Sequence, residues 1–180
     1  MTTIAVVTGN PKPQSRTHTV ALAIADAVAA GIGDAGAGDT GTGKIGTGRI
    51  VVDLAEHAPR LFDWADPELT SLTAAVSGAD VAVFASPTYK ASYTGLLKAF
   101  LDRYGSNGLA GVVAVPVMTG GWPGHLLAVE VHLRPVLVEL GATVPARGVY
   151  VTEAELSDVD GAAAKWAKDA VPLIARSVVR

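Results

Sequence analysis

A turn close to the start of the chain carries the residue types that bind an anion. The turn, Gly9-Asn10-Pro11-Lys12-Pro13-Gln14-Ser15-Arg16-Thr17, follows a short apolar run at 4–8 and precedes an alanine-rich helical pattern. A loop that opens a helix directs backbone N–H groups and the positive end of the helix dipole at one point. Around that point the sequence places two cations and several hydroxyl groups, namely Lys12, Arg16, Ser15, Thr17 and Thr19. Each charge-assisted hydrogen bond to a phosphate contributes about 1.5–3 kcal/mol, so this turn is a candidate phosphate site.

Other interpretations of this turn follow from its spacing. The simplest is a solvated turn in which Thr17 caps a helix. A Walker P-loop is excluded because no Gly-Lys-Ser/Thr triplet closes the turn, and Gly9 lacks the two partner glycines of a dinucleotide fingerprint. A phosphatase with a cysteine nucleophile is excluded because the sequence contains no cysteine. The turn alone therefore leaves the anion site and the plain helix cap both open.

Two further stretches have the residue types expected around a flat ring of a ligand. The segments 87–93 and 119–125 are neutral, rich in small residues and edged with Tyr89, Tyr93 and Trp122. Small residues allow close approach of the backbone, and aromatic or proline surface packs against a flat apolar ring. A phosphate pocket beside a flat slot lined with amide groups describes flavin mononucleotide (FMN).

The elements that position these loops follow from the hydrophobic pattern. Apolar runs predict strands at 4–8, 49–54, 80–86, 112–118 and 143–151. Helical patterns lie between and after them, at about 17–30, 67–78, 96–104, 126–140 and 160–178. Nearly all-apolar strands that alternate with helices predict an α/β fold, a doubly wound five-stranded parallel sheet with helices on both faces. Pro116 cannot donate to a sheet ladder, so a bulge or a missing hydrogen bond is expected there.

This fold predicts where the candidate residues meet. In an open doubly wound sheet, ligands bind outside the carboxyl ends of the strands. The segments 10–17, 87–93 and 119–125 each leave such an end. We therefore expect one site in which the first loop holds phosphate and the other two hold the ring.

Composition limits the classes to which the chain can belong. Its 180 residues suit one domain, 1–180, in which the glycine-rich stretch 31–48 is interpreted as a flexible surface insertion. The formal net charge of −3 argues against nucleic acid and an anionic membrane as main partners. No apolar run has the length of a membrane span and no cleavage signal is visible, so a cytoplasmic location is expected. No histidine or carboxylate cluster has ligand spacing, so no metal site is predicted.

Three stretches resemble the NAD(P)H-dependent FMN reductase family, in particular the reductases paired with alkanesulfonate monooxygenases. They are the turn 9–17, the segment Ser86-Pro87-Thr88-Tyr89-Lys90-Ala91-Ser92-Tyr93-Thr94-Gly95-Leu96-Leu97-Lys98, and Thr119-Gly120-Gly121 with His125-Leu126-Leu127-Ala128-Val129. The second segment, with Pro-x-Tyr-Lys followed by Gly-Leu-Leu-Lys, is the most specific. The resemblance covers nearly the whole chain apart from the insertion and the residues after Val151. It departs at Asn10, where many relatives have Ser and where Asn still offers a donor and an acceptor.

The resemblance implies a flavodoxin-like fold that binds FMN. By position, the phosphate would be held by Asn10, Lys12, Ser15, Arg16 and Thr17. The ring would be lined on one side by Pro87, Thr88, Tyr89 and Lys90, and on the other by Thr119, Gly120 and Gly121. No catalytic acid, base or nucleophile is assigned, because the flavin carries the chemistry.

The leading hypothesis is an oxidoreductase that transfers hydride from NADPH or NADH to FMN and supplies reduced FMN to a monooxygenase. One alternative is a flavodoxin-like electron carrier. Another is an NAD(P)H-dependent quinone or azo reductase with tightly bound FMN. The electron carrier is disfavoured because it would need a strongly acidic docking surface, which a net charge of −3 does not provide.

The predicted helix 126–140 is apolar almost all round, with Leu127, Val131 and Leu133 among its apolar residues. A helix that covers a sheet needs one apolar stripe, so this pattern predicts a second cover, a homo-oligomer (a tetramer or a dimer). Pro135 removes a helical hydrogen bond, which predicts a kink or π-bulge around 131–132. The resemblance points the same way, because related two-component reductases can carry an extra residue in this helix at a tetramer interface.

Overall fold

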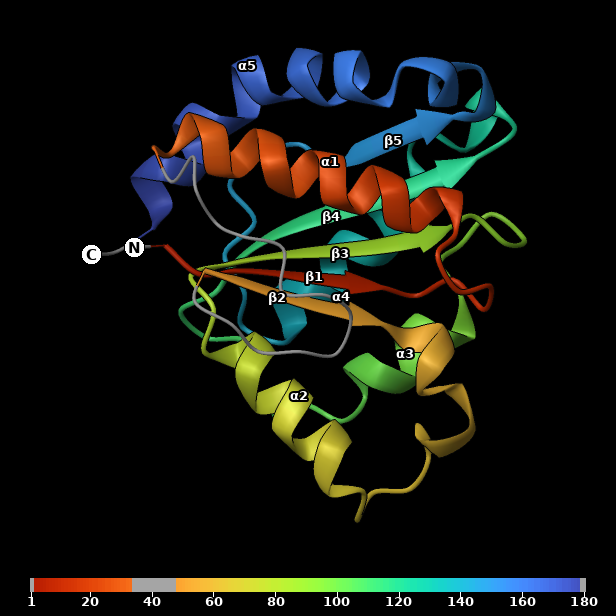
Figure 1. Cartoon of the computed structure of the whole chain (residues 1–180), viewed down its shortest axis with the longest axis vertical. Coiled ribbons are helices and arrows are strands. Elements are labelled where there is room, and N and C mark those ends of the chain that lie inside the picture. Colours follow the sequence, from red (N-terminus) through yellow and green to blue (C-terminus); the bar gives the residue numbers. More distant parts are fainter. Residues whose placement is uncertain (1, 34–47, 179–180) are drawn as a thin grey trace.

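Five parallel strands form the centre of the computed structural model, which describes residues 2–33 and 48–178 (Figure 1). The strands are β1 (Ile4–Thr8), β2 (Arg49–Asp53), β3 (Val81–Pro87), β4 (Val113–Gly120) and β5 (Val149–Thr152). Their order is β2-β1-β3-β4-β5, and each neighbouring pair is parallel. The chain winds outward from β1 to β2 and then, through β3, in the opposite direction, so the switch point lies between β1 and β3. The predicted doubly wound sheet is confirmed.

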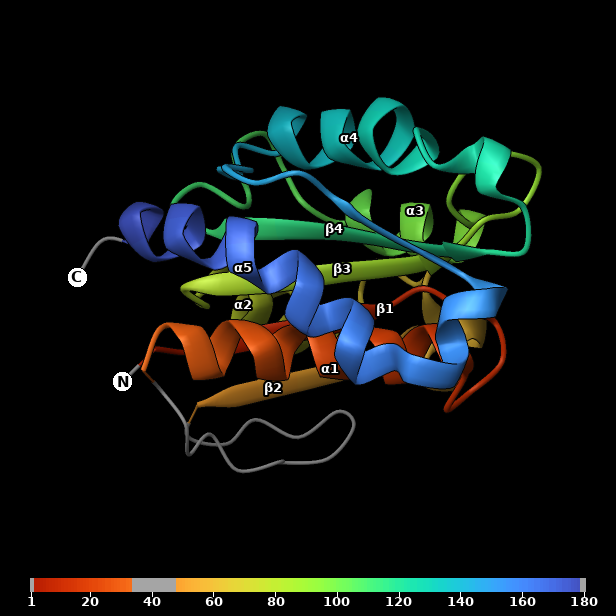
Figure 2. The same cartoon turned by 90° about the horizontal axis from the view of Figure 1, so that it is seen from above.

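Helices cover both faces of this sheet (Figures 1 and 2). They are α1 (Arg16–Gly31), α2 (Pro67–Ser77), α3 (Gly95–Leu101), α4 (Arg134–Glu139) and α5 (Val159–Ser177). α1 and α5 pack together on one face, and α2, α3 and α4 lie on the other. Because side chains alternate along a strand, Val6 and Val83 join the apolar layer under α1, while Val7 and Phe84 join the layer under α3.

Short helical turns occupy parts of the connections. They are η1 (Leu54–Glu56), η2 (Ala58–Arg60), η3 (Pro123–His125) and η5 (Glu153–Asp158). Within 2–33 and 48–178, no helix combines the length and the apolar character needed to cross a membrane. The predicted glycine-rich insertion falls mostly on residues 34–47, which lie outside the described residues.

The strand that contains Pro116 has no bulge, because β4 pairs with β3 residue by residue over the whole length of β3. Backbone N–H groups alternate between the two sides of a strand. Ala114 donates to the carbonyl of Thr143 on the β5 side, so position 116 faces that side as well. On that side the segment 144–148 is not part of a strand, and β5 begins to pair with β4 only at Val117. Pro116 therefore interrupts no hydrogen bond between strands. The predicted fifth strand, 143–151, is correspondingly shortened to β5.

The helix that contains Pro135 is irregular, as its sequence predicts. A π-helix, η4 (Val129–Leu133), leads directly into α4. Proline cannot donate to the carbonyl one turn earlier, and a wider π turn accommodates the missing bond. The predicted π-bulge is confirmed. Leu133, one of the apolar residues of this predicted helix, is fully buried in the core of its own chain, so it is not available to a second copy.

Candidate functional site

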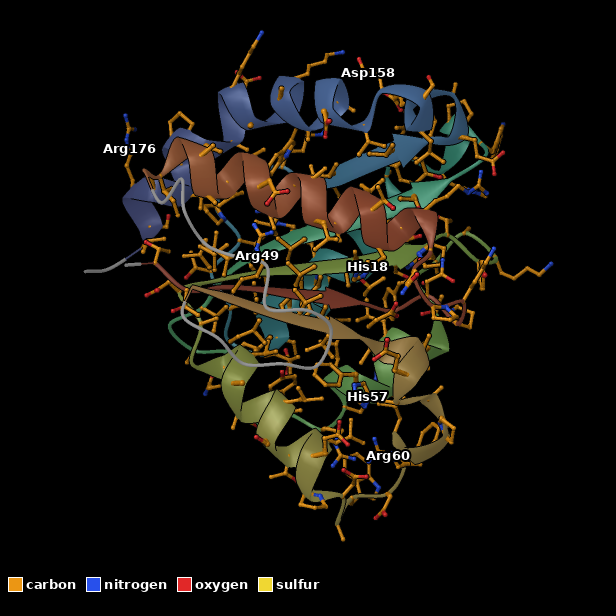
Figure 3. The ribbon with its side chains drawn as sticks, in the orientation of Figure 1. His18, Arg49, His57, Arg60, Asp158 and Arg176 are labelled. Carbon is orange, nitrogen blue, oxygen red and sulfur yellow. The ribbon has the colours of Figure 1, made fainter. Side chains whose placement is uncertain are left out.

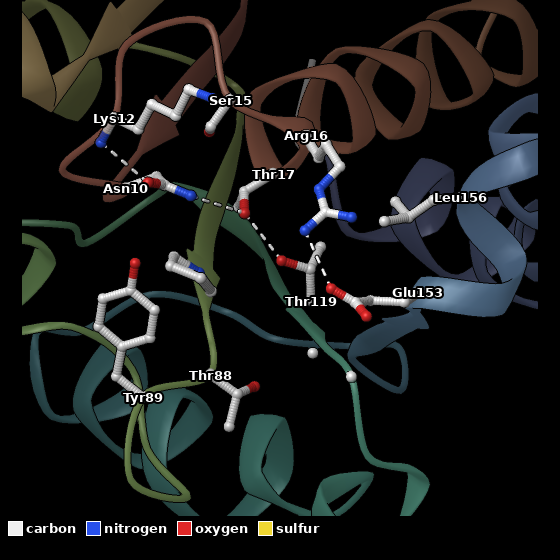
Figure 4. Close-up of a pocket in the computed structure, with 13 residues that line it drawn as sticks. Asn10, Lys12, Ser15, Arg16, Thr17, Thr88, Tyr89, Thr119, Glu153 and Leu156 are labelled. Carbon is white, nitrogen blue, oxygen red and sulfur yellow. Dashed lines mark hydrogen bonds and ion pairs between the residues drawn. The ribbon is translucent and has the colours of Figure 1, made fainter.

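A pocket of about 310 Å³ opens at the carboxyl ends of β1, β3, β4 and β5 (Figure 4). It lies where an open doubly wound sheet places its ligand. Of the twelve predicted binding residues, all but Lys90 line it, namely Asn10, Lys12, Ser15, Arg16, Thr17, Pro87, Thr88, Tyr89, Thr119, Gly120 and Gly121. Two lining residues, Glu153 and Leu156, were not predicted.

The loop after β1 is shaped by Asn10 and Ser15. Ser15 caps α1, and its hydroxyl accepts a hydrogen bond from the backbone N–H of His18 at 3.2 Å. The Asn10 side chain accepts from the backbone N–H of Lys12 at 2.9 Å and donates to the hydroxyl of Thr17 at 3.2 Å. Asn10 therefore holds the turn against the first turn of the helix. The interpretation in which Thr17 caps the helix is wrong, because Ser15 has that place.

Contacts with two other strands hold the same loop. The hydroxyls of Thr17 and Thr119 lie 2.8 Å apart in a buried contact that joins the β1 loop to β4. Asp53, at the end of β2, accepts from the backbone N–H of Gln14 at 2.9 Å. Gln14 has a φ of 49°, a left-handed conformation that costs a residue with a Cβ about 1–2 kcal/mol. The buried Asp53 thus stabilises a strained residue of the loop. Asp53 was not predicted as a residue of the site, although a carboxylate at the end of a predicted strand could have indicated one.

Two cations, Lys12 and Arg16, lie at the N-terminal end of α1 (Figure 4). Arg16 forms an ion pair with Glu153, with 2.9 Å between Nη2 and Oε1. Both side chains are well exposed, at 71% and 58%. For Lys12, no ion pair is found within the part of the chain that the structure describes. The pocket therefore has a strongly polar end at the start of α1.

Glu153 reaches the pocket from η5, the turn that follows β5. Thr152 donates to the Glu155 carboxylate through its backbone N–H at 2.8 Å and through its hydroxyl at 2.7 Å. The backbone bond, followed by the hydroxyl bond, lowers the pKa of Glu155 from its ordinary value. The Thr-x-x-Glu pattern predicts the start of a helix, and it follows the fifth predicted strand directly. This pattern could therefore have predicted that residue 153 lies at the end of the fifth strand, beside the other loops.

The loop after β3 forms the opposite wall of the pocket. The backbone N–H of Thr88 donates to the carbonyl of Thr119 at 2.7 Å, which joins this loop to β4. The Thr88 hydroxyl is buried, and within the described residues it has no hydrogen-bond partner. Tyr89 is half-exposed and stands at the pocket across from Asn10 (Figure 4). This wall offers backbone, hydroxyl and aromatic surface without charge.

Lys90 lies outside the pocket because of a tight turn. Tyr89 and Ser92 exchange two backbone hydrogen bonds, of 2.8 and 3.1 Å, and so close a two-residue hairpin. Its central residues, Lys90 and Ala91, have φ values of 51° and 64°, as both central residues of a type I′ turn do. This turn carries Lys90 to an exposed tip.

Other aromatic residues expected at the edge lie beside the pocket. Trp122 and His125 pack edge to face, with 4.7 Å between their ring centroids. Neither they nor Tyr93 are among the lining residues. The arrangement as a whole can bind an anion at the α1 end and a flat group against the β3 and β4 loops. Within 2–33 and 48–178 no group of three or more His, Asp or Glu side chains could hold a metal ion.

Comparison with known sequences agrees with this geometry. A family model described as NADPH-dependent FMN reductase matches residues 2–156. FMN reductase (NADPH) from Escherichia coli strain K12 is 40% identical over 92 residues, which cover 51% of this chain and 48% of that protein. NADH-dependent FMN reductase SfnF from Pseudomonas putida is 29% identical over 154 residues, covering 83% of this chain and 76% of that protein. In several of these matches, the E. coli one included, the chain spans about half the length of the curated relative.

Solved structures extend the likeness to the rest of the chain. An NADH:FMN oxidoreductase, solved in its apo form, aligns with a TM-score of 0.82 and 29% identity over 99% of this chain and 91% of that one. An oxidoreductase from Corynebacterium diphtheriae aligns with a TM-score of 0.78 and 29% identity over 98% of both chains. The flavodoxin-like fold expected from the sequence is therefore confirmed.

Proposed function

The chain belongs to the NADPH-dependent FMN reductase family, and we propose that it is a single FMN-binding domain that transfers hydride from NADPH or NADH to FMN. FMN supplies the redox chemistry when bound, and the protein contributes binding and orientation. The observation that carries the proposal is that residues from three separate loops line one pocket, with both cations at the start of α1. Both nucleotides are included because the relatives are named for NADPH in one case and NADH in another.

The lining fits FMN by its chemistry. Lys12 and Arg16 would hold the phosphate, together with N–H groups of the first turn of α1 that have no helical partner. Pro87, Thr88 and Gly120 would face the ring, since these lining residues carry no charge. No acid or base is assigned, because the residues proposed here bind and orient the flavin and move no proton.

A steady-state assay tests the proposed function. We expect the purified chain to oxidise NADPH or NADH when FMN is added, as followed by the loss of nicotinamide absorbance. Heat-denatured protein provides the background rate of the same mixture. Absence of turnover with either nucleotide would contradict the proposal and favour the flavodoxin-like electron carrier.

The fate of reduced FMN is part of the proposal. We propose that it leaves the pocket and serves an FMNH2-dependent monooxygenase. Support comes from the exposed, ion-paired phosphate end of the pocket, which suits exchange with solvent. Purified protein is then expected to lose its flavin on gel filtration. Protein that stays yellow would instead favour the quinone or azo reductase alternative. The cytoplasmic location stays a prediction, which fractionation of source cells tests.

We also propose that a second copy of the chain covers the helix at 126–140. The predicted helix begins later than expected, because Leu126 and Leu127 lie in the turn before η4. These two residues, with Val131 of η4 and Val138 of α4, are between 45% and 60% exposed, while Leu133 and Leu137 are buried against the sheet. Single exposed apolar residues are common, but several along one short segment indicate an interaction surface. The proposed assembly is a homotetramer or, failing that, a homodimer.

Sedimentation of charged variants measures this assembly. Leu127→Glu and Val131→Glu are expected to shift the protein to a monomer that keeps its fold, because both side chains are exposed within the chain. Leu133→Glu is expected to unfold the chain itself, because an unpaired buried carboxylate costs several kcal/mol (about 3 or more). A monomeric wild type, or charged variants that assemble normally, would rule out this interface.

A further inference from the structure

The proposed function gives no role to Glu153, a carboxylate that lines the pocket. Glu153 and Arg16 are 137 positions apart in the sequence, yet the carboxylate accepts a hydrogen bond from the guanidinium at 2.9 Å (Figure 4). Its second oxygen lies over the loop after β4, because a Cβ placed on Gly121 would be 3.5 Å from Oε2. Glu153 therefore contacts the cationic end of the pocket and lies close to the glycines of the loop after β4.

The position of Glu153 is costly for an anionic ligand. A phosphate at the start of α1 and the Glu153 carboxylate require the same guanidinium, and a strong Arg–phosphate contact uses two of its N–H groups at once. A phosphate dianion and a carboxylate that face one cation also repel each other. In contrast, the ion pair contributes little to folding, because both side chains are more than half exposed. The main energetic effect of Glu153 therefore falls on the ligand.

We propose that Glu153 competes with the flavin phosphate for Arg16 and so weakens the binding of FMN. This inference rests on the proposed function, since it assigns a role within the FMN pocket. Glu153 sets how readily FMN leaves and how strongly the pocket prefers FMN to riboflavin, which lacks the phosphate. A chain that supplies reduced flavin to another enzyme needs such release.

Binding of FMN and riboflavin to Glu153→Gln, measured by quenching of flavin fluorescence, tests the proposal. We expect the Kd for FMN to fall about threefold to tenfold, as the loss of one exposed ion pair and one repulsion implies. The Kd for riboflavin is expected to change less than twofold. Because a glutamine oxygen can still accept from Arg16, Glu153→Ala is measured too, with the same direction expected. Glu56→Gln, which changes an exposed glutamate outside the pocket lining, is the charge-matched control and should leave both Kd values unchanged.

A double-mutant cycle with Arg16→Ala identifies the cause. If the two anions compete for Arg16, the gain from Glu153→Gln shrinks when Arg16 is absent. An equal gain in both backgrounds would mean general repulsion and would overturn the proposal, as would an unchanged or weaker affinity for FMN in both Glu153 variants. A wild type that binds FMN no better than riboflavin, and is unaffected by Arg16→Ala, would instead overturn the phosphate site of the proposed function.

Discussion

Replacing Gly9 with alanine is expected to lower the free energy of unfolding by about 3 kcal/mol, at the upper end of what overpacking costs. A Cβ on Gly9 would lie 2.4 Å from the Cβ of Leu97 and 3.0 Å from its Cα. Contacts this short with the backbone of α3 are not relieved by rotating a side chain, so the loop or the helix must shift. Hydrogen bonds oppose that shift, because the Gly9 N–H donates to the carbonyl of Ala85 at 2.7 Å and the hydroxyl of Thr94 donates to the Gly9 carbonyl.

Urea unfolding of Gly9→Ala, compared with Gly95→Ala, measures this effect. Gly95 is the first residue of α3, and a Cβ placed there meets nothing within 4 Å. Gly95→Ala is therefore expected to leave the stability unchanged or to raise it by about 0.5–1 kcal/mol. Affinity for FMN is expected to fall in Gly9→Ala alone, since the displaced loop carries the residues proposed to bind the phosphate. Equal stability of the two variants would mean that β1 and α3 do not pack as closely as described.

Arg16→Ala is expected to weaken FMN binding by about 1.5–3 kcal/mol, roughly tenfold to a hundredfold in Kd. The variant removes a cation from the start of α1, where the phosphate is proposed to bind. The binding of riboflavin should hardly change, because it has no phosphate. Thermal stability should also be preserved, since alanine favours the helix and the lost ion pair is exposed.

Titration of both flavins into wild type, Arg16→Ala and Arg176→Ala provides the comparison. Arg176→Ala changes the net charge equally, and Figure 3 places Arg176 near the end of α5, away from the pocket. A general effect of net charge would weaken FMN binding in both variants. Equal losses for FMN and riboflavin in Arg16→Ala would make Arg16 a structural residue and would place the phosphate elsewhere.

Most of the fold follows from short-range features of the sequence. Apolar runs that alternate with helical patterns predicted the parallel sheet, and the turn 9–17 predicted a polar loop at the start of α1. Pro135 predicted the π-helix, because a proline removes a specific hydrogen bond one turn earlier in any sequence context. Periodicity, missing donors and loop composition act within a few residues, so they can be interpreted without knowing what packs against them.

The tertiary structure decided which residues of the predicted loops meet. Lys90 belongs to a predicted motif, yet a tight hairpin turn carries it to an exposed tip. Glu153 and Asp53 lie outside every predicted motif, yet they contact Arg16 and the backbone of Gln14. The contacts of Glu153 and Asp53 depend on how the ends of the strands are aligned in space. Neither composition nor spacing contains that alignment for residues that are 137 and 39 positions apart.

The segment 126–140 shows most clearly what the sequence and the tertiary structure each determine. Its sequence is apolar on all sides, which predicted both burial and a further partner. Leucine and valine at successive positions do not reveal which side faces the sheet, since the residue types are the same on both. Packing against β4 buries Leu133 and leaves Leu127 and Val131 exposed. The amount of apolar surface was thus determined by the sequence, and its orientation by the tertiary structure, because only contact with the sheet distinguishes one side of such a helix from the other.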